Sequence, residues 1–162
     1  MKSLVIYYSH AGGTAYVAYK LLNAISKKGE ADIFELTYHK GKRGIFLQFL
    51  DRVMPFWVNL SDVPLDVKDY GLICVGTPVW GGRPCPPVQK YLQKCYNIEG
   101  KKVIYFQVYG VELSGRRCVK YIKNILNKKG CTDIIDISIP WAQVRSEEFI
   151  DKIINERVAG TT

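Results

Sequence analysis

Two short segments of the chain carry residues suited to binding a ligand. Residues 76–87 read GTPVWGGRPCPP and follow four apolar residues at 72–75. The glycines permit close approach of a ligand to the backbone, the prolines stiffen the chain, and Trp80 offers a face for stacking. Because this segment resembles a loop at which a buried strand stops abruptly, we expect it to hold a flat aromatic ligand.

The second segment, residues 9–14, reads SHAGGT and lies between an apolar run and a stretch with helical spacing. A helix beginning here exposes unpaired N–H groups beside the hydroxyls of Ser9 and Thr14. Such groups, with the positive end of the helix dipole, bind phosphate. A plain connection in which Thr14 is only the N-cap also fits, so the phosphate interpretation depends on pairing with the Trp80 segment.

Residues typical of catalysis or metal binding are sparse. The only histidines are His10, in the second segment, and His39, which we expect at the surface. Five cysteines are spread along the chain without a Cys-x-x-Cys pair: Cys74, Cys85, Cys95, Cys118 and Cys131. This spacing favours buried, reduced thiols over a zinc site. We therefore expect no metal and assign no catalytic residue.

Length and composition predict one domain with a substantial core, spanning residues 1–162. The chain has 162 residues, of which 48% are hydrophobic. No apolar run reaches the roughly 20 residues that span a bilayer, and the N-terminus shows no signal-peptide pattern. We expect a cytoplasmic protein.

The chain is strongly basic. Its 23 Lys and Arg residues against 15 Asp and Glu give a net charge of +8. Much of this charge lies in residues 39–43 and in residues 116–129, the latter containing no acidic residue. We expect solvated helix faces there. A field of this sign also favours acidic partner proteins, whereas nucleic acid is not the partner we expect.

Apolar runs alternate with helical stripes along the chain, which predicts an α/β fold with a parallel sheet. We expect strands near residues 3–8, 31–36, 71–76, 102–108 and 133–139, and helices around 17–25, 88–95, 118–126 and 150–154. These elements fit a doubly wound five-stranded sheet with helices on both faces. Ligands in that architecture bind at the carboxyl ends of the strands, where strand order reverses. Both segments follow predicted strands.

Residues 39–68 are longer than a simple connection and form an apolar, basic-flanked insertion. Five of its apolar residues have helical spacing: Phe46, Phe49, Leu50, Val53 and Trp57. We predict an amphipathic helix there. It either covers the sheet, closes over a ligand as a lid, or offers a partner surface, including a homodimer through residues 39–60.

Both segments resemble those of a known family. The run SHAGGT is similar to the flavodoxin phosphate loop, Ser/Thr-x-Thr-Gly-x-Thr, and residues 76–84 are similar to the isoalloxazine loop of short flavodoxin-like proteins. The resemblance extends from the first strand to the fifth. It implies a flavodoxin fold with strand order 2-1-3-4-5, noncovalently bound FMN and a redox function.

The resemblance also implies which residues bind FMN. The phosphate loop is Ser9, His10, Ala11, Gly12, Gly13 and Thr14. The ring would be lined by Thr77, Pro78, Val79, Trp80, Gly81 and Gly82. The loop after the fourth strand adds Gln107, Val108, Tyr109, Gly110 and Val111, with Tyr109 as a second stacking partner. Ala11 departs from the family pattern, because it lacks the hydroxyl of the usual threonine.

Three functions remain open at this stage. The first is an FMN-binding redox protein that transfers one or two electrons between partner proteins, acidic ones among them, or small acceptors. The second is an FMN-dependent NAD(P)H:quinone-type reductase, in which Arg83, Arg116 or Arg117 contacts the dinucleotide. The third is a binding protein that kept the fold, lost FMN and uses its basic surface.

Overall fold

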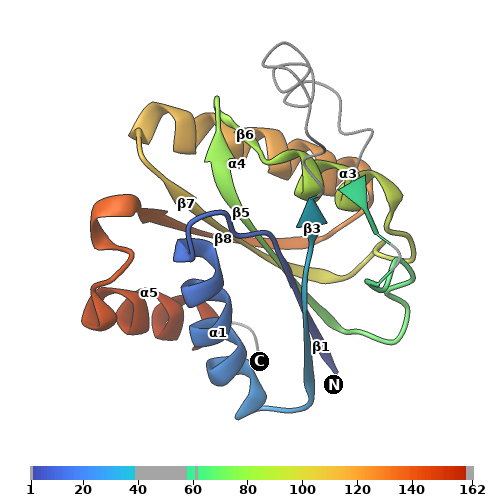
Figure 1. Cartoon of the computed structure of the whole chain (residues 1–162). Helices are drawn as coiled ribbons and strands as arrows, with labels where there is room; N and C mark the ends of the chain where they lie inside the picture. The colour runs from blue at the N-terminus through green and yellow to red at the C-terminus, as the bar shows by residue number, and fades with distance from the viewer. Residues whose placement is uncertain (1, 39–57, 61, 160–162) are drawn as a thin grey trace.

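Five parallel strands form the centre of the computed structural model, which describes residues 2–38, 58–60 and 62–159 (Figure 1). The strands are β1 (Ser3–Tyr7), β2 (Ala31–Glu35), β5 (Leu72–Trp80), β7 (Lys102–Tyr109) and β8 (Asp133–Pro140). Their spatial order is β2-β1-β5-β7-β8, with every neighbouring pair parallel. Numbered along the chain, these strands have the predicted order 2-1-3-4-5.

Helices cover both faces of the sheet, as predicted. In Figure 1, α1 (Gly13–Ser26) and α5 (Glu147–Ala159) lie on one side, and α3 (Pro86–Lys94) and α4 (Glu112–Lys128) lie on the other. Alternate residues of a strand point to opposite faces. Within β1, Val5 and Tyr7 therefore pack with α1 and α5, while Leu4 and Ile6 pack with α3 and α4.

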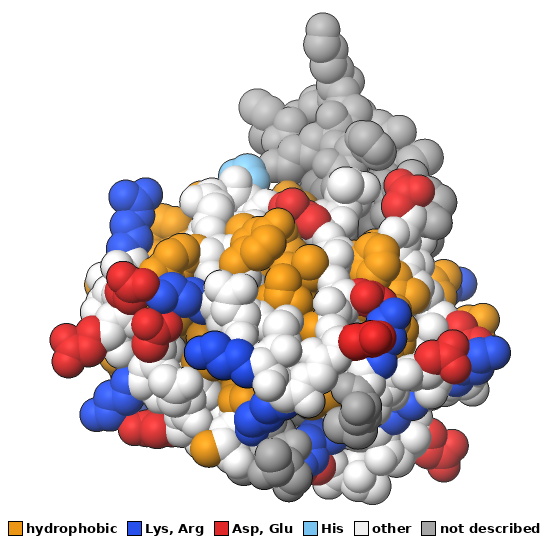
Figure 2. Space-filling model, turned by 90° about the horizontal axis from the view of Figure 1, so that it is seen from below, with side chains coloured by type: hydrophobic (Ala, Val, Ile, Leu, Met, Phe, Trp, Pro, Cys, Tyr) orange, Lys and Arg blue, Asp and Glu red, His pale blue; other side chains and the backbone are white. Residues whose placement is uncertain are grey.

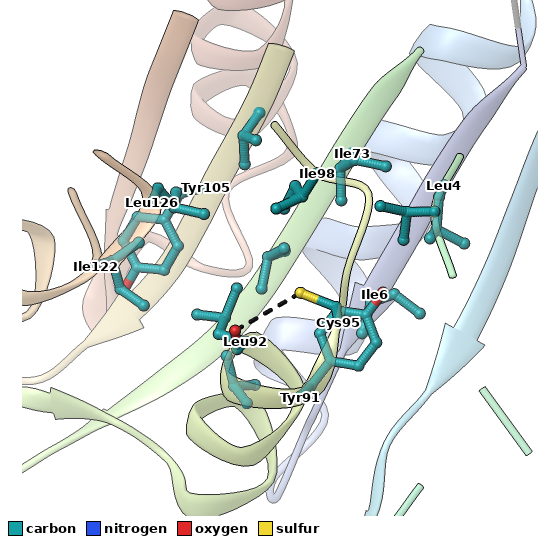
Figure 3. Close-up of a cluster of buried hydrophobic side chains, with 14 of the residues drawn as sticks. Leu4, Ile6, Ile73, Tyr91, Leu92, Cys95, Ile98, Tyr105, Ile122 and Leu126 are labelled. Carbon is teal, nitrogen blue, oxygen red and sulfur yellow. Dashed lines mark hydrogen bonds between the residues drawn. The ribbon is translucent and has the colours of Figure 1, made fainter. Parts of the chain in front are cut away.

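The core beneath α3 and α4 is shown in Figure 3. Tyr91 and Leu92 of α3 and Ile122 of α4 are fully buried against the sheet. Cys95 ends α3, and its thiol lies 3.7 Å from the carbonyl oxygen of Leu92. Since both faces of β1 are buried, residues 4–7 form a continuous apolar run, and this run located the strand closely.

All five cysteines are buried and free, so the prediction of packed thiols is confirmed. Burial raises the pKa of Cys85 and Cys118 to about 12 and that of Cys95 to about 11. These thiols are therefore held in their neutral, unreactive form at physiological pH.

The structure corrects the prediction that a strand stops at residue 76. Strand β5 continues to Trp80, pairs with β7 as far as Pro78 opposite Val108, and turns back into the short antiparallel strand β6 (Arg83–Pro84). Gly81 and Gly82 form the two-residue turn with φ of 61° and 79°. Two adjacent residues with positive φ are what a type I′ hairpin turn requires, and glycine adopts them without steric cost.

Only part of the insertion at residues 39–68 can be compared with its prediction. The predicted helix around residues 46–57 lies outside the described residues. Short strands β3 (Thr37–Tyr38) and β4 (Val58–Asn59) pair with each other. Beyond them, Val67 is fully buried, and the Tyr91 hydroxyl donates to the Pro64 carbonyl at 3.0 Å. This described part of the insertion therefore packs against α3 and the core beneath it.

Charged groups on the described surface are partly neutralised by one another. In the basic helix α4, Arg116 pairs with Glu112 and Lys123 pairs with Asp136. Lys129, the residue that caps the end of α4, donates to the carbonyl oxygen of Cys95. Figure 2 shows lysine and arginine side chains interspersed with aspartate and glutamate over the face seen there. Among the described helices, none is long and apolar enough to cross a membrane.

Candidate functional site

A hollow of about 240 Å³ lies at the carboxyl ends of four strands. It adjoins β1 and β5, the neighbouring strands at which the chain order reverses. Doubly wound sheets bind ligands at this position. Its lining residues are Ser9, His10, Ala11, Gly13, Thr14, Pro78, Val79, Trp80, Val108, Tyr109, Gly110 and Trp141.

The start of α1 forms one end of this hollow. Gly12 is the N-cap, with φ of 82°, and Gly13 is the first helical residue. Thr14 is therefore not the N-cap, which corrects the alternative considered from the sequence. The hydroxyl of Ser9 accepts the N–H of Ala15 at 3.2 Å, and this contact fastens the loop to the helix.

Several hydrogen-bond donors at the start of α1 have no partner among the described residues. No described residue accepts the N–H groups of Gly13 or Thr14. Thr14 is only 2% exposed, lines the hollow and makes no hydrogen bond through its hydroxyl within the described part of the chain. Unpaired N–H groups and a hydroxyl at the positive end of a helix dipole form an anion cradle.

Trp80 forms the opposite wall. Its indole packs edge-on against Tyr8, with ring centroids 6.0 Å apart, and edge-on against His10, at 6.1 Å. Both contacts join the end of β5 to the loop after β1. The indole is therefore fixed between the two segments that sequence analysis paired.

Thr77 holds the Trp80 hairpin in place and does not line the hollow. This residue is fully buried; its hydroxyl accepts the N–H of Cys85 at 3.0 Å and donates to the carbonyl oxygen of Pro78 at 2.8 Å. These bonds fasten the strand before the turn to the residue after β6. The sequence correctly placed Thr77 in the segment but not the direction of its side chain.

Three of the predicted glycines, Gly12, Gly81 and Gly82, lie beside the hollow and do not line it, whereas Gly13 and Gly110 do. Gly81 is exposed at the hairpin tip. A Cβ on Gly82 would lie 3.3 Å from Cβ of Arg117, so the turn packs closely on α4. Gly12 lines a neighbouring hollow.

The segment after β7 reaches the hollow through Val108, Tyr109 and Gly110, as expected. The Tyr109 ring rests on α4, where a Cβ on Gly115 would lie only 2.9 Å from its Cγ. Gln107 is fully buried, and its side-chain amide donates to the carbonyl oxygen of Gly115 at 3.0 Å. Gln107 thus fixes the strand against α4 and does not line the hollow.

Trp141 is a lining residue that sequence analysis missed. It follows directly after β8, in the short 3-10 turn η1 (Trp141–Gln143), and is 50% exposed. Its ring lies against the start of α1, since a Cβ on Gly13 would be 2.7 Å from Cζ3 of Trp141. The available signal was an aromatic residue two positions after the fifth predicted strand.

Comparison with known proteins gives matches among solved structures. No family model and no curated protein matches the chain. A flavoprotein in complex with FMN from Lactobacillus acidophilus aligns with a TM-score of 0.62 at 20% identity, covering 91% of this chain and 97% of that one. An archaeal flavodoxin aligns with a TM-score of 0.61 at 20% identity, covering 98% and 99%. Flavodoxin 1 from Bacillus cereus aligns with a TM-score of 0.66 at 14% identity, covering 98% and 95%.

The chain has the flavodoxin fold. This confirms the architecture implied by the sequence resemblance.

Within this flavodoxin fold, the hollow is notable for its lack of ionic groups. None of its described lining residues is Lys, Arg, Asp or Glu, and His10 is exposed at its edge. An anion in this hollow would therefore have backbone N–H groups and hydroxyls, and no Lys or Arg side chain, as donors among the described lining residues. The same hollow that contains the cradle is also lined by the aromatic side chains of Trp80, Tyr109 and Trp141.

The contact between Gly13 and Trp141 gives a first prediction. In Gly13→Ala the new methyl group collides with the indole, so Trp141 must move. We expect a changed NMR shift of the Trp141 indole N–H, assigned by its loss in Trp141→Phe. Gly110→Ala is the control, since a Cβ there meets nothing within 4 Å and φ is not positive. An unchanged shift in Gly13→Ala would contradict this packing.

The hairpin bonds give a second prediction. Thr77→Val keeps the shape of the side chain but leaves the buried N–H of Cys85 without an acceptor. The free energy of unfolding in urea should fall by about 1–3 kcal/mol. Thr132→Val is the matched control, because its exposed hydroxyl makes only a 3.4 Å contact, and it should change stability by no more than about 0.5 kcal/mol. Equal effects of the two variants would refute the role of Thr77.

Proposed function

We propose that this protein binds FMN noncovalently in the hollow and transfers electrons between a partner protein and the flavin. The observation that carries the proposal is made at Thr14, a residue that is 2% exposed and lines the same hollow as Trp80. Within the described residues, its hydroxyl and the backbone N–H groups of Gly13 and Thr14 have no hydrogen-bond partner. A phosphate and a flat ring on one molecule match these two ends. The similar protein from Lactobacillus acidophilus was solved with FMN.

The phosphate would bind at the cradle. Gly13 and Thr14 donate their backbone N–H groups, and the Thr14 hydroxyl adds a third donor. Ala11 lines the hollow without a hydroxyl, which removes a hydrogen bond worth about 1 kcal/mol. The Ser9 hydroxyl, which accepts from Ala15, can still donate its own proton to a phosphate oxygen.

The flavin ring would bind between Trp80 and Tyr109, against Pro78, Val79 and Val108. Bound FMN supplies the redox chemistry, and the protein supplies orientation and electrostatics. The apolar walls exclude water from one side of the ring. No charged side chain among the described lining residues neutralises a negative ring, so this environment favours the neutral forms of the flavin.

An acidic redox partner fits the surface around the hairpin tip. Arg117 packs against Gly82, and the guanidinium of Arg83 lies 5.4 Å from the Tyr121 ring centroid. Both cations are exposed and adjoin the turn that follows Trp80. Complementary charge at this position would steer an acidic protein to the edge of the bound flavin.

The other two functions have less support. The guanidinium of Arg116 already pairs with Glu112, which leaves it poorly suited to a nicotinamide dinucleotide phosphate. Loss of FMN would leave no role for a cradle whose donors have no partner among the described residues, facing the same hollow as a fixed indole. The electron carrier is therefore the function that the geometry supports best.

Titration of the purified chain with FMN, followed by quenching of flavin fluorescence, tests the proposal. We expect a dissociation constant of about 1 μM or tighter, which is roughly 8 kcal/mol of binding free energy. Trp80→Leu retains apolar bulk but loses the stacking face, and should weaken binding about tenfold. Tyr96→Leu is the control, because Tyr96 is exposed and lies outside the hollow. No quenching of FMN by the folded wild-type protein would refute the proposal.

The cradle makes a separate prediction about the phosphate. Thr14→Val removes one donor to a charged group while keeping the side-chain shape, so FMN should bind about tenfold or more weakly. Riboflavin lacks the phosphate, and its affinity should be the same for Thr14→Val and wild type. Parallel titrations with the two flavins measure this difference. An equal loss for both ligands would show that Thr14 acts only through packing.

A further inference from the structure

A second hollow of about 350 Å³ adjoins the first at the start of α1. Ala11, Gly13 and Trp141 line both hollows, so Trp141 is a wall shared between them. The remaining lining residues of the second hollow are Gly12, Tyr16, Val144 and Arg145. A group attached to a phosphate at the cradle has this hollow as its neighbouring space.

We propose that the second hollow holds the adenosine monophosphate half of a flavin dinucleotide, FAD, whose FMN half occupies the first hollow. This inference rests on the proposed function, because it requires a flavin phosphate at the cradle. It extends that function by naming a second phosphate subsite and an adenine subsite. Three features of the second hollow support it: a cation, aromatic faces and open space at the junction.

Arg145 supplies the cation that the first hollow lacks. It is exposed and, within the described residues, forms no ion pair. Two of the acidic groups on α5, Glu147 and Asp151, pair with Lys20, while Glu148 is exposed in the same first turn. A guanidinium presents several donors in a fixed plane and suits a phosphate with two free oxygens.

Tyr16 and Trp141 supply faces for a purine. Both are large side chains that remain exposed, at 37% and 50%. Exposed aromatic side chains beside a phosphate site provide stacking platforms that accept any base. The Lys20 ammonium lies 5.9 Å from the Tyr16 ring centroid, on a side chain already fixed by α5. Lys20 thereby restrains the Tyr16 ring beside the second hollow.

Small residues leave space where the two hollows meet. A Cβ on Gly12 would meet nothing within 4 Å, and position 11 carries only a methyl group. The volume of the second hollow lies within the range of about 300–1,000 Å³ typical of ligand pockets, whereas the first alone is smaller. Ala11, which weakens a mononucleotide site by losing a hydroxyl, leaves room for a pyrophosphate.

Isothermal titration calorimetry with FMN, FAD, riboflavin and AMP tests the inference. Wild-type protein should bind FAD about tenfold or more tightly than FMN, because an additional charged hydrogen bond and a stacked base are gained. Arg145→Gln should reduce the affinity for FAD about tenfold and leave that for FMN unchanged. Arg157→Gln, an exposed arginine in the last turn of α5, is the matched control and should change neither.

A second variant tests the adenine subsite independently of Arg145. Tyr16→Leu should weaken FAD and spare FMN. The inference is overturned if FAD binds no better than FMN, or if both variants lower the two affinities equally. It is also overturned if AMP binds to FMN-saturated protein while FAD gains nothing, since the hollow then serves a separate nucleotide. In each of these cases FMN still binds, so the proposed function stands; failure of every flavin to bind would remove both.

Discussion

The parallel register between β1 and β5 determines where everything at the site lies. Tyr7 is opposite Gly76, and the N–H of Tyr8 donates to the Gly76 carbonyl at 3.1 Å. In this register β1 ends opposite Gly76 while β5 runs on to Trp80, so the loop of Ser9 emerges beside the last residues of β5. Gly76 is itself constrained, because a Cβ there would lie 2.1 Å from Cζ of Phe106. The Phe106 ring of β7 thus requires glycine at position 76, the same residue that aligns β1 with β5.

Much of the architecture was predictable because a parallel sheet covered on both faces leaves a strong pattern in sequence. Each of the five long strands coincides with a predicted apolar run, and each described long helix with a predicted stripe. The end of β5 was not predictable in this way. Pro78 and Gly81 normally interrupt strands, yet here β7 pairs with Pro78 and the glycine pair closes a hairpin. The sequence marked the proline and the glycines as residues that interrupt strands. It did not show that β7 would pair with this segment, because that pairing depends on residues distant in sequence.

The limits of the site prediction have the same cause. Neighbouring residues in an extended strand point in opposite directions, so membership of a ligand-binding segment does not decide which side chains face the ligand. Thr77 turns toward Cys85 and fastens the hairpin, while Trp80 faces His10 and the hollow. Trp141 meets Gly13 only through the fold, because the two residues are far apart in sequence. The spacing of apolar residues along the chain cannot predict a contact between residues so far apart in sequence.

The distribution of charge separates two kinds of recognition. The hollow's anion cradle consists of backbone N–H groups and hydroxyls, with no cation among its described lining residues, whereas Arg83 and Arg117 are exposed beside the hairpin. Salt screens exposed charges strongly and partly buried dipoles much less. On the proposed function, the free energy of phosphate binding at the cradle would therefore be only weakly sensitive to ionic strength, while docking of a partner at the arginines would weaken as salt rises. Under the proposed function, the exposed arginines at the hairpin would therefore govern how a partner approaches, while the backbone N–H groups and hydroxyls of the cradle would hold the flavin phosphate.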